Sequence, residues 1–185
     1  YDSLVRAQQD YYRESRFADI WVSLVRAPLS VMPTLESIPG VTVADSRVTF
    51  LATLDLDDSG IPAHGRFISV PANARPALND VLVERGRYLA PGASDEVIIS
   101  TKFAEARGYQ PGDNIRAIIN GRSRDLEIVG IGNSPEHIYA VPPGALYPED
   151  ERYGVFWASR ELLGPAYNMD GAFNEAFVSI ADNAN

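Results

Sequence analysis

Hydrophobic and polar positions alternate through the first clear element of the chain, FADIWVSLVRAP at residues 17–28. Ile20, Val22 and Leu24 fall on one side of an extended segment, and this period of two predicts a β-strand. A proline ends the segment. A short helix is predicted next, over residues 30–38, and the sequence IPGV then turns the chain.

The residues before this strand follow a weaker, helical period. Leu4, Val5, Tyr11 and Tyr12 are spaced to share one side of a helix over residues 1–16. A helix with so little apolar surface is marginal in isolation. We therefore expect it to continue a segment that precedes the first residue given.

Two strand-like runs in the first half of the chain predict a hairpin. Residues 41–56 form the first run, and RFISVP at residues 66–71 forms the second. The sequence DDSG, at residues 57–60, supplies the turn, so the loop is longer than two residues. The stretch from 75 to 92 is irregular and closes on Pro and Gly.

A strand–helix–strand–strand unit follows. EVIIS, at residues 96–100, reads as a buried strand, and KFAEARGY, at residues 102–109, as a short helix. Two further strands are predicted over residues 115–121 and 124–132. They are joined by NGRS, whose Asn and Gly tolerate positive φ.

The last third of the chain mixes the two periods. A loop over residues 141–154 leads into a predicted strand, GVFWAS, and then into a helix over residues 159–168. Ser159 is placed to cap this helix, with Glu161 in its first turn. A final strand is predicted at NEAFVSIAD, residues 174–182.

This order of elements predicts an α+β fold. Strands and helices alternate without a steady βαβ rhythm and hairpins are common, so we expect a mixed sheet with packed helices. The unit at residues 94–140 is locally self-contained, and we predict that it is a smaller, inserted β-rich subdomain. Residues 1–93 and 141–185 would then form a larger mixed α/β subdomain.

Composition and charge narrow the possible functions. The 185 residues are 45% hydrophobic, which is typical of a globular protein with a core. No apolar run approaches the roughly 18 residues of a membrane-spanning helix. The net charge of −9 without a basic stripe argues against nucleic-acid binding and against docking on an anionic membrane. The absence of cysteine excludes disulfides, thiolate catalysis and Cys-ligated zinc.

No motif of catalysis, cofactor binding or metal binding is present. The two histidines, His64 and His137, lie far apart without metal-ligand spacing, and we expect both on the surface or in loops. The acids of DLDDSG resemble a calcium loop, but Arg66 stands where an EF-hand requires Glu. Nucleophile-elbow and glycine-rich phosphate-binding sequences are also missing. We therefore assign no catalytic, cofactor-binding or metal-binding residue.

The remaining acidic residues have simpler explanations. Asp95–Glu96 and the acids at residues 149–151 are adjacent charges in predicted loops, where solvation is the usual state. In the Pro-Gly-Asp sequence at residues 111–113, Pro fixes φ and Gly allows a left-handed turn. We expect Asp113 to hydrogen-bond the backbone of this turn rather than to act in catalysis.

Three tyrosines mark a possible partner surface. Tyr139, Tyr147 and Tyr153 lie in or beside the Pro-rich loop, while the other aromatic residues fall on predicted strands and pack in the core by default. An exposed aromatic loop would suit protein recognition.

Several of these sequences together resemble a known family. The strand ending at Ser100, KFAEARGY, QPGDNIRAI and LEIVGIG follow one another in the order found in the MacB-like periplasmic core domain of FtsX-like ABC transporter permeases. RFADIWVSLVRAP resembles the first strand after that family's first membrane helix, IPGV the following turn, and ERGRYLAPGASDEVIIS the entry to its inserted unit. The resemblance covers nearly the whole chain.

The resemblance implies a domain between the first and second membrane helices of an inner-membrane permease, on the periplasmic side. It implies two protein partners, a cytosolic ATPase acting through the membrane part and a second permease copy. It also implies an unidentified periplasmic substrate or partner protein. The domain itself would be non-catalytic and would need no cofactor. Residues 134–177 differ from the macrolide-exporter and cell-division members, so no specific substrate is carried over.

Two alternatives of other classes remain open. A secreted hydrolase would place a carboxylate of raised pKa in a deep pocket near His64 or His137. A free-standing periplasmic binding or adhesion domain would lack long apolar segments on both sides of the chain. The flanking sequence of the full gene product separates the second alternative from a permease domain.

Overall fold

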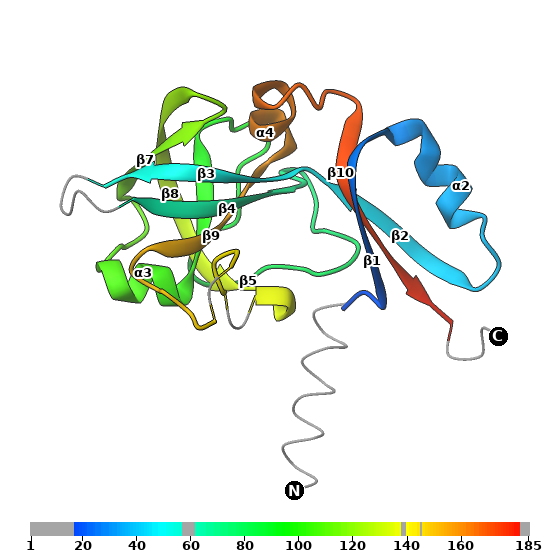
Figure 1. The fold of residues 1–185 in the computed structure, drawn as a ribbon, viewed down its shortest axis with the longest axis horizontal. Helices are drawn as coiled ribbons and strands as arrows, with labels where there is room; N and C mark the ends of the chain where they lie inside the picture. The colour runs from blue at the N-terminus through cyan, green and yellow to red at the C-terminus, as the bar shows by residue number, and fades with distance from the viewer. Residues whose placement is uncertain (1–16, 57–61, 138–139, 145, 182–185) are drawn as a thin grey trace, which may run out of the picture.

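The computed structural model describes residues 17–56, 62–137, 140–144 and 146–181, and its strands form two sheets. The sheets lie side by side along the long axis of the molecule (Figure 1). The predicted helix at the start of the chain and the predicted DDSG turn lie outside the described residues.

A three-stranded antiparallel sheet contains the first and the last strand. Its order is β1 (Ile20–Pro28), β10 (Ala172–Ile180) and β2 (Val41–Arg47). The predictions of a strand at each of these positions are confirmed. Between β1 and β2 the chain forms a 3-10 helix, η1 (Leu29–Val31), and a helix, α2 (Met32–Glu36), which is shorter than predicted and packs on β2.

The chain passes from the first sheet to the second at Val48. Sequence alone predicts one strand from residue 41 to 56, but Val48 separates β2 from the first strand of the other sheet. The backbone N–H of Val48 donates a hydrogen bond to Ser69 Oγ at 2.8 Å instead of joining a ladder. A buried side-chain acceptor thus satisfies the backbone donor where the strand breaks.

The second sheet has seven strands and curls into a ring. In chain order these strands are β3 (Thr49–Asp55), β4 (Ala63–Val70), β5 (Leu82–Gly86), β6 (Glu96–Ser100), β7 (Asn114–Ile119), β8 (Arg122–Asn133) and β9 (Tyr153–Ser159). Their order in space is β5-β8-β6-β9-β4-β3-β7, and β7 pairs again with β8. This last pairing closes six strands on one another and leaves β5 beside β8. β4–β9 and β6–β8 are parallel and the other pairs antiparallel, so the sheet is mixed as predicted.

Two short helices pack on this sheet. α3 (Thr101–Arg107) follows β6 directly, and α4 (Arg160–Ala166) follows β9. The N-terminus of α4 is capped as predicted, since Ser159 Oγ accepts a hydrogen bond from Leu162 N at 3.1 Å. Each helix covers apolar side chains that the ring presents.

Aromatic rings fill the interior of the ring. Phe156 stacks on Phe67 with ring centroids 4.8 Å apart and meets Phe103 edge-on at 5.4 Å. Gly65 and Gly154 lie against these rings. A Cβ at Gly154 would come within 2.7 Å of Phe103 Cγ, so glycine is needed there for the ring to approach the backbone.

The inserted subdomain predicted at residues 94–140 is not confirmed. β6, β7 and β8 come from this segment, but they pair with β9, β3 and β5 in one continuous sheet. The break between sheets falls instead at Val48 and between β9 and β10. Local sequence identified the unit correctly, but the long strand β8 pairs with three others and ties the unit into the ring.

Candidate functional site

A buried group of charges joins the two sheets. Arg47, at the end of β2, binds Glu136 through two bonds: Nη1 to Oε2 at 2.6 Å and Nη2 to Oε1 at 2.9 Å. Its Nε donates to Glu175 of β10, which lies opposite it in the sheet. Glu136 belongs to η2 (Pro135–His137), a 3-10 helix that follows β8 of the other sheet. We call Arg47, Glu136 and Glu175 the junction cluster.

The junction cluster keeps one positive and two negative side chains in contact despite burial. Burial acts to lower the pKa of Arg47, but Glu136 and Glu175 outweigh this effect, and the pKa is raised. Removing one member of a buried ion pair leaves the other charge without compensation. The carboxylates here accept hydrogen bonds from the Arg47 guanidinium. The arrangement therefore suits a structural tie between the sheets.

Two more side chains extend this tie. The indole Nε1 of Trp21, in β1, donates to Glu136 Oε1 at 2.7 Å. Arg66, in β4, donates through Nη2 to Glu175 Oε1 at 3.3 Å. Glu136, in η2, thus accepts from β1 and β2 of the first sheet. Glu175 accepts from β2 of the first sheet and β4 of the second.

His137 lies next to the junction cluster in the connection that follows β8, and it is partly buried rather than on the surface. Its ring packs near that of buried Trp157, with centroids 6.2 Å apart, and its Nε2 is buried without a hydrogen-bond partner. Burial, then the positive charges of Arg47 and Arg66, lower the pKa of His137 to about 3, although Glu175 opposes them. The imidazole is therefore neutral near pH 7 and a weak base.

The geometry around the two histidines does not support a hydrolase. The carboxylates beside His137 are the two that bind Arg47. His64 lies in β4 between Thr53 of β3 and Tyr153 of β9. Neither histidine lines the hollow beside α4 or the one beside Arg116. A nucleophile–base pair is not found at either residue among the hydrogen bonds of the described residues.

Two of the acidic residues singled out from sequence, Glu96 and Asp113, have structural partners. Glu96 binds Arg87 through both oxygens, at 2.6 and 2.9 Å, and the hydrogen bonds from Arg87 lower its pKa although burial opposes them. Asp113 Oδ2 accepts a bond from Gln110 N at 2.8 Å, so the prediction that it stabilises its turn is confirmed. In the part of the chain that the structure describes, no three His, Asp or Glu side chains are grouped to hold a metal ion.

The three tyrosines of the predicted partner surface have different environments. Tyr153 is only 5% exposed, at the start of β9, so that residue is wrongly predicted to face a partner. Tyr147 is 69% exposed beside exposed Leu146 in the Pro-rich loop, and its role in binding stays a prediction. Tyr139 lies outside the described residues.

A second exposed apolar surface was not anticipated from sequence. On the three-stranded sheet, Ile20 and Val22 share one side of β1 and are about half exposed, and Val25 is 92% exposed. Ile180 at the end of β10 and Val43 of β2 are also exposed. The sequence of β1 does indicate this surface, because the strand carries large apolar side chains on both of its faces. A three-stranded sheet cannot bury both faces.

The fold has known counterparts among solved structures. The extracellular domain of the noncanonic ABC-type transporter YknZ from Gram-positive bacteria superposes with a TM-score of 0.56, at 11% sequence identity, over 88% of this chain and 83% of its own. The periplasmic region of MacB from Actinobacillus actinomycetemcomitans superposes with a TM-score of 0.50, at 12% identity, over 94% of this chain and 71% of its own.

Sequence comparisons add nothing to this similarity, since no family model and no curated protein matches the chain. Within the described residues, no helix has the length and hydrophobicity needed to cross a membrane. At identities of 11% and 12%, the similarity is one of fold. The chain shares the fold of the extracytoplasmic domains of ABC-type transporter permeases, which is the fold that its sequence resemblance implied.

Proposed function

We propose that this chain is the non-catalytic extracytoplasmic domain of an FtsX-like ABC transporter permease. In this function it couples ATP hydrolysis by a cytosolic ATPase to the handling of a substrate or partner protein outside the membrane. The observation that carries the proposal is the antiparallel pairing of β1 with β10, in a fold shared with the extracellular domain of YknZ.

A domain inserted between two consecutive membrane helices must begin and end at one place. Here Ile20 lies opposite Val178, so the first and last strands run side by side in opposite directions. Asp19 ties them together, because its N–H donates to Val178 O at 2.9 Å and its Oδ2 accepts from Ile180 N at 2.8 Å. Figure 1 shows the described chain starting and finishing on the same side of the molecule.

The same arrangement offers a path for mechanical coupling. A displacement applied at the start of β1 or the end of β10 acts on the whole three-stranded sheet through its ladders. The junction cluster then connects that sheet to η2 and so to β8 of the ring. A buried, doubly bonded Arg–Glu contact keeps a defined geometry, which a rigid linkage requires. By this proposal the domain faces the periplasm, and a second permease copy completes the transporter.

Cysteine labelling in cells tests the proposal directly, since the domain contains no cysteine of its own. In a full-length gene product without other cysteines, Tyr147→Cys should react with a membrane-impermeant maleimide applied from the periplasmic side. Ala158→Cys, at a fully buried position, is the matched control and should react only after unfolding. Labelling of Tyr147→Cys only after the inner membrane is broken would place the domain in the cytosol and refute the proposal.

The flanking sequence gives a second, independent test. The full gene product should carry long apolar segments on both sides of this domain, each of about 20 residues. A full-length product without such segments would instead favour a free-standing periplasmic binding domain.

A further inference from the structure

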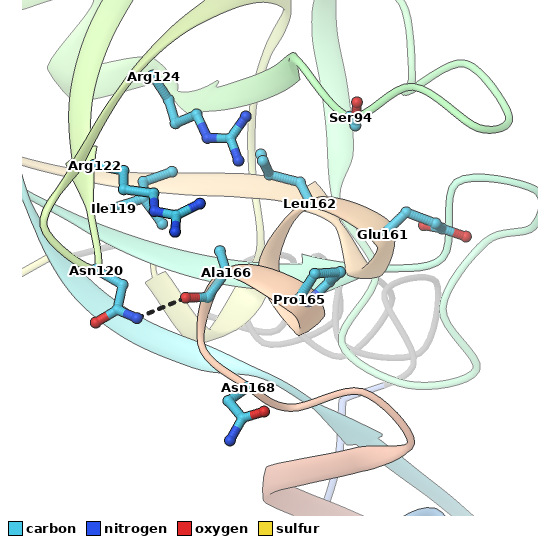
Figure 2. A pocket seen from close by; sticks show the side chains of 10 residues that line it. All are labelled: Ser94, Ile119, Asn120, Arg122, Arg124, Glu161, Leu162, Pro165, Ala166 and Asn168. Carbon is cyan, nitrogen blue, oxygen red and sulfur yellow. Dashed lines mark hydrogen bonds between the residues drawn. The ribbon is translucent and has the colours of Figure 1, made fainter.

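A surface hollow of about 430 Å³ lies between α4 and the turn that joins β7 to β8. This volume is within the range of small-molecule sites. Figure 2 shows Arg122 and Arg124 of β8 on one side of the hollow and Leu162, Pro165 and Ala166 of α4 on the other.

The two arginines are placed by the register of the hairpin. Arg122 lies opposite Ile119 and Arg124 opposite Ala117, and residues opposite each other in an antiparallel pair share a face of the sheet. Ile119 and Ala117 are buried in the main core, so the arginines occupy the core-facing side of β8. The two arginines therefore lie on the same face of the hairpin as the buried apolar residues, at the end of the hairpin where this face is no longer buried. Both guanidinium groups are directed into the hollow (Figure 2).

Neither arginine has a charged partner in the part of the chain that the structure describes. Among the ion pairs of the described residues, none involves Arg122 or Arg124, and Glu161 at the edge of the hollow pairs with neither. Arg116 on the opposite face of the same hairpin binds Asp125 at 2.9 Å and Asp55 at 3.5 Å. Two adjacent cations with no anion between them repel each other, and one bound anion would remove this repulsion.

The rest of the lining is partly apolar. Ile119 and Leu162 belong to the core and also line the hollow, together with Pro165 and Ala166. Ser94 and Asn168 supply neutral polar groups at its margin. A ligand that fits this lining has an anionic group for the guanidinium pair and a short apolar portion for α4.

We propose that this hollow binds an organic anion carrying a phosphate or carboxylate group and a short apolar portion. Such an anion could be dissolved or could be the headgroup of a lipid. In Figure 1, α4 lies on the side of the molecule away from the described chain ends. If those ends lead to the membrane, as in the proposed function, the hollow beside α4 lies on the side away from the bilayer. The dissolved form is therefore the ligand expected, and the binding itself does not depend on the permease assignment.

The test uses hexyl phosphate as the probe and the 185-residue chain as the protein. Backbone amide shifts should move on titration in the β7–β8 turn and α4, saturably, and inorganic phosphate should bind more weakly because it lacks the apolar portion. Arg122→Gln and Arg124→Gln should each weaken binding about tenfold, the usual effect of losing a hydrogen bond to a charged group. Arg26→Gln, an exposed arginine of β1 outside the hollow, makes the same charge change and should leave the affinity unaltered.

Several results would overturn the inference. They are absence of saturable binding at millimolar hexyl phosphate, equal loss of affinity in Arg26→Gln, or shifts located elsewhere. If inorganic phosphate bound as tightly as hexyl phosphate, the proposed contact between α4 and an apolar portion of the ligand would be refuted. Binding to phosphatidylglycerol vesicles without binding to monomeric hexyl phosphate would refute a dissolved ligand. Because these measurements need no membrane part, their failure leaves the labelling test of the permease assignment unaffected.

Discussion

Arg47 and Glu175 lie directly opposite each other on β2 and β10, and their ion pair is buried where the two sheets meet. Each side chain is 6% exposed, and the Arg47 guanidinium also lies over the ring of Phe177, 4.9 Å from its centroid. The pair belongs to one sheet, but Glu136 brings the other sheet to the same guanidinium. Arg47 thus binds carboxylates on both sides of the contact between the sheets.

We expect Arg47→Met to destabilise the domain by about 3–5 kcal/mol, because it leaves the buried Glu136 without a cation and Glu175 with the partly exposed Arg66 alone. Urea unfolding followed by tryptophan fluorescence measures this loss. Arg152→Met is the matched control, since its ion pair with Glu149 is exposed and is worth no more than about 1 kcal/mol. Adding Glu136→Gln and Glu175→Gln to Arg47→Met should recover part of the stability. Similar losses in the two single variants would show that the junction cluster does not hold the sheets.

His137 should make the stability of the domain fall as the pH falls. Its pKa is about 3 in the folded domain against 6.5 for an ordinary histidine. Between these values the unfolded chain binds a proton that the folded domain does not, so protonation favours unfolding. We expect the free energy of unfolding to fall by about 1 kcal/mol per pH unit below pH 6.5. This slope is less than the limit for one proton because the residue is only half-buried.

The comparison of two variants isolates this effect. His137→Gln should flatten the pH dependence of the unfolding free energy between about pH 5 and 6.5, while His64→Gln should retain it. Glu96, whose pKa is lowered by its hydrogen bonds with Arg87, is present in both variants, so its contribution at the acid end of this range cancels in the comparison. An unchanged slope in His137→Gln would mean that the folded domain accommodates the charged ring.

Sequence predicted the local elements well and the contacts between them poorly. The strands β1 and β10, the Ser159 cap and the Asp113 turn each depend on neighbouring residues, so their signals are local. The junction cluster unites residues 89 and 128 positions apart, and no local pattern specifies such partners. Tyr153 follows a Pro-rich loop but begins a strand buried on both faces. Tyr153 is buried because β9 lies in a sheet that closes on itself through the pairing of β7 with β8. The sequence did not predict this closure.

Gly154→Ala should destabilise the domain although it adds only one methyl group. The new Cβ would come within 2.7 Å of Phe103 Cγ in a fully packed interior, and such overpacking costs about 1–3 kcal/mol. Gly164→Ala is the matched control. Gly164 lies in α4, and its Cβ would have its nearest neighbour, Asp170 Oδ1, at 3.5 Å, an ordinary contact distance. Alanine in a helix gains about 0.5–1 kcal/mol over glycine. Thermal unfolding of both variants should therefore shift in opposite directions.

Asp113→Ala should cost about 0.5–1 kcal/mol through loss of the bond from Gln110 N. Asp113→Asn keeps an oxygen acceptor and should be nearly neutral in urea unfolding. A carboxylate with a catalytic role would instead make both variants equally defective in function. Normal permease activity in Asp113→Asn and in a folded Asp113→Ala protein is the outcome expected for a residue that only shapes its turn.

A disulfide between β1 and β10 tests whether the three-stranded sheet moves as one body. Ile20 and Val178 lie opposite each other, and neither is fully buried, so Ile20→Cys with Val178→Cys changes little else. If β1 and β10 transmit force together, oxidation should leave the ATPase rate and transport of the reconstituted permease unchanged. Loss of transport on oxidation, with recovery after reduction, would show that the two strands must separate during the cycle. The coupling path would then run through only one of the two strands. That strand would be β10, because the junction cluster binds β2 and β10 directly and contacts β1 only through Trp21.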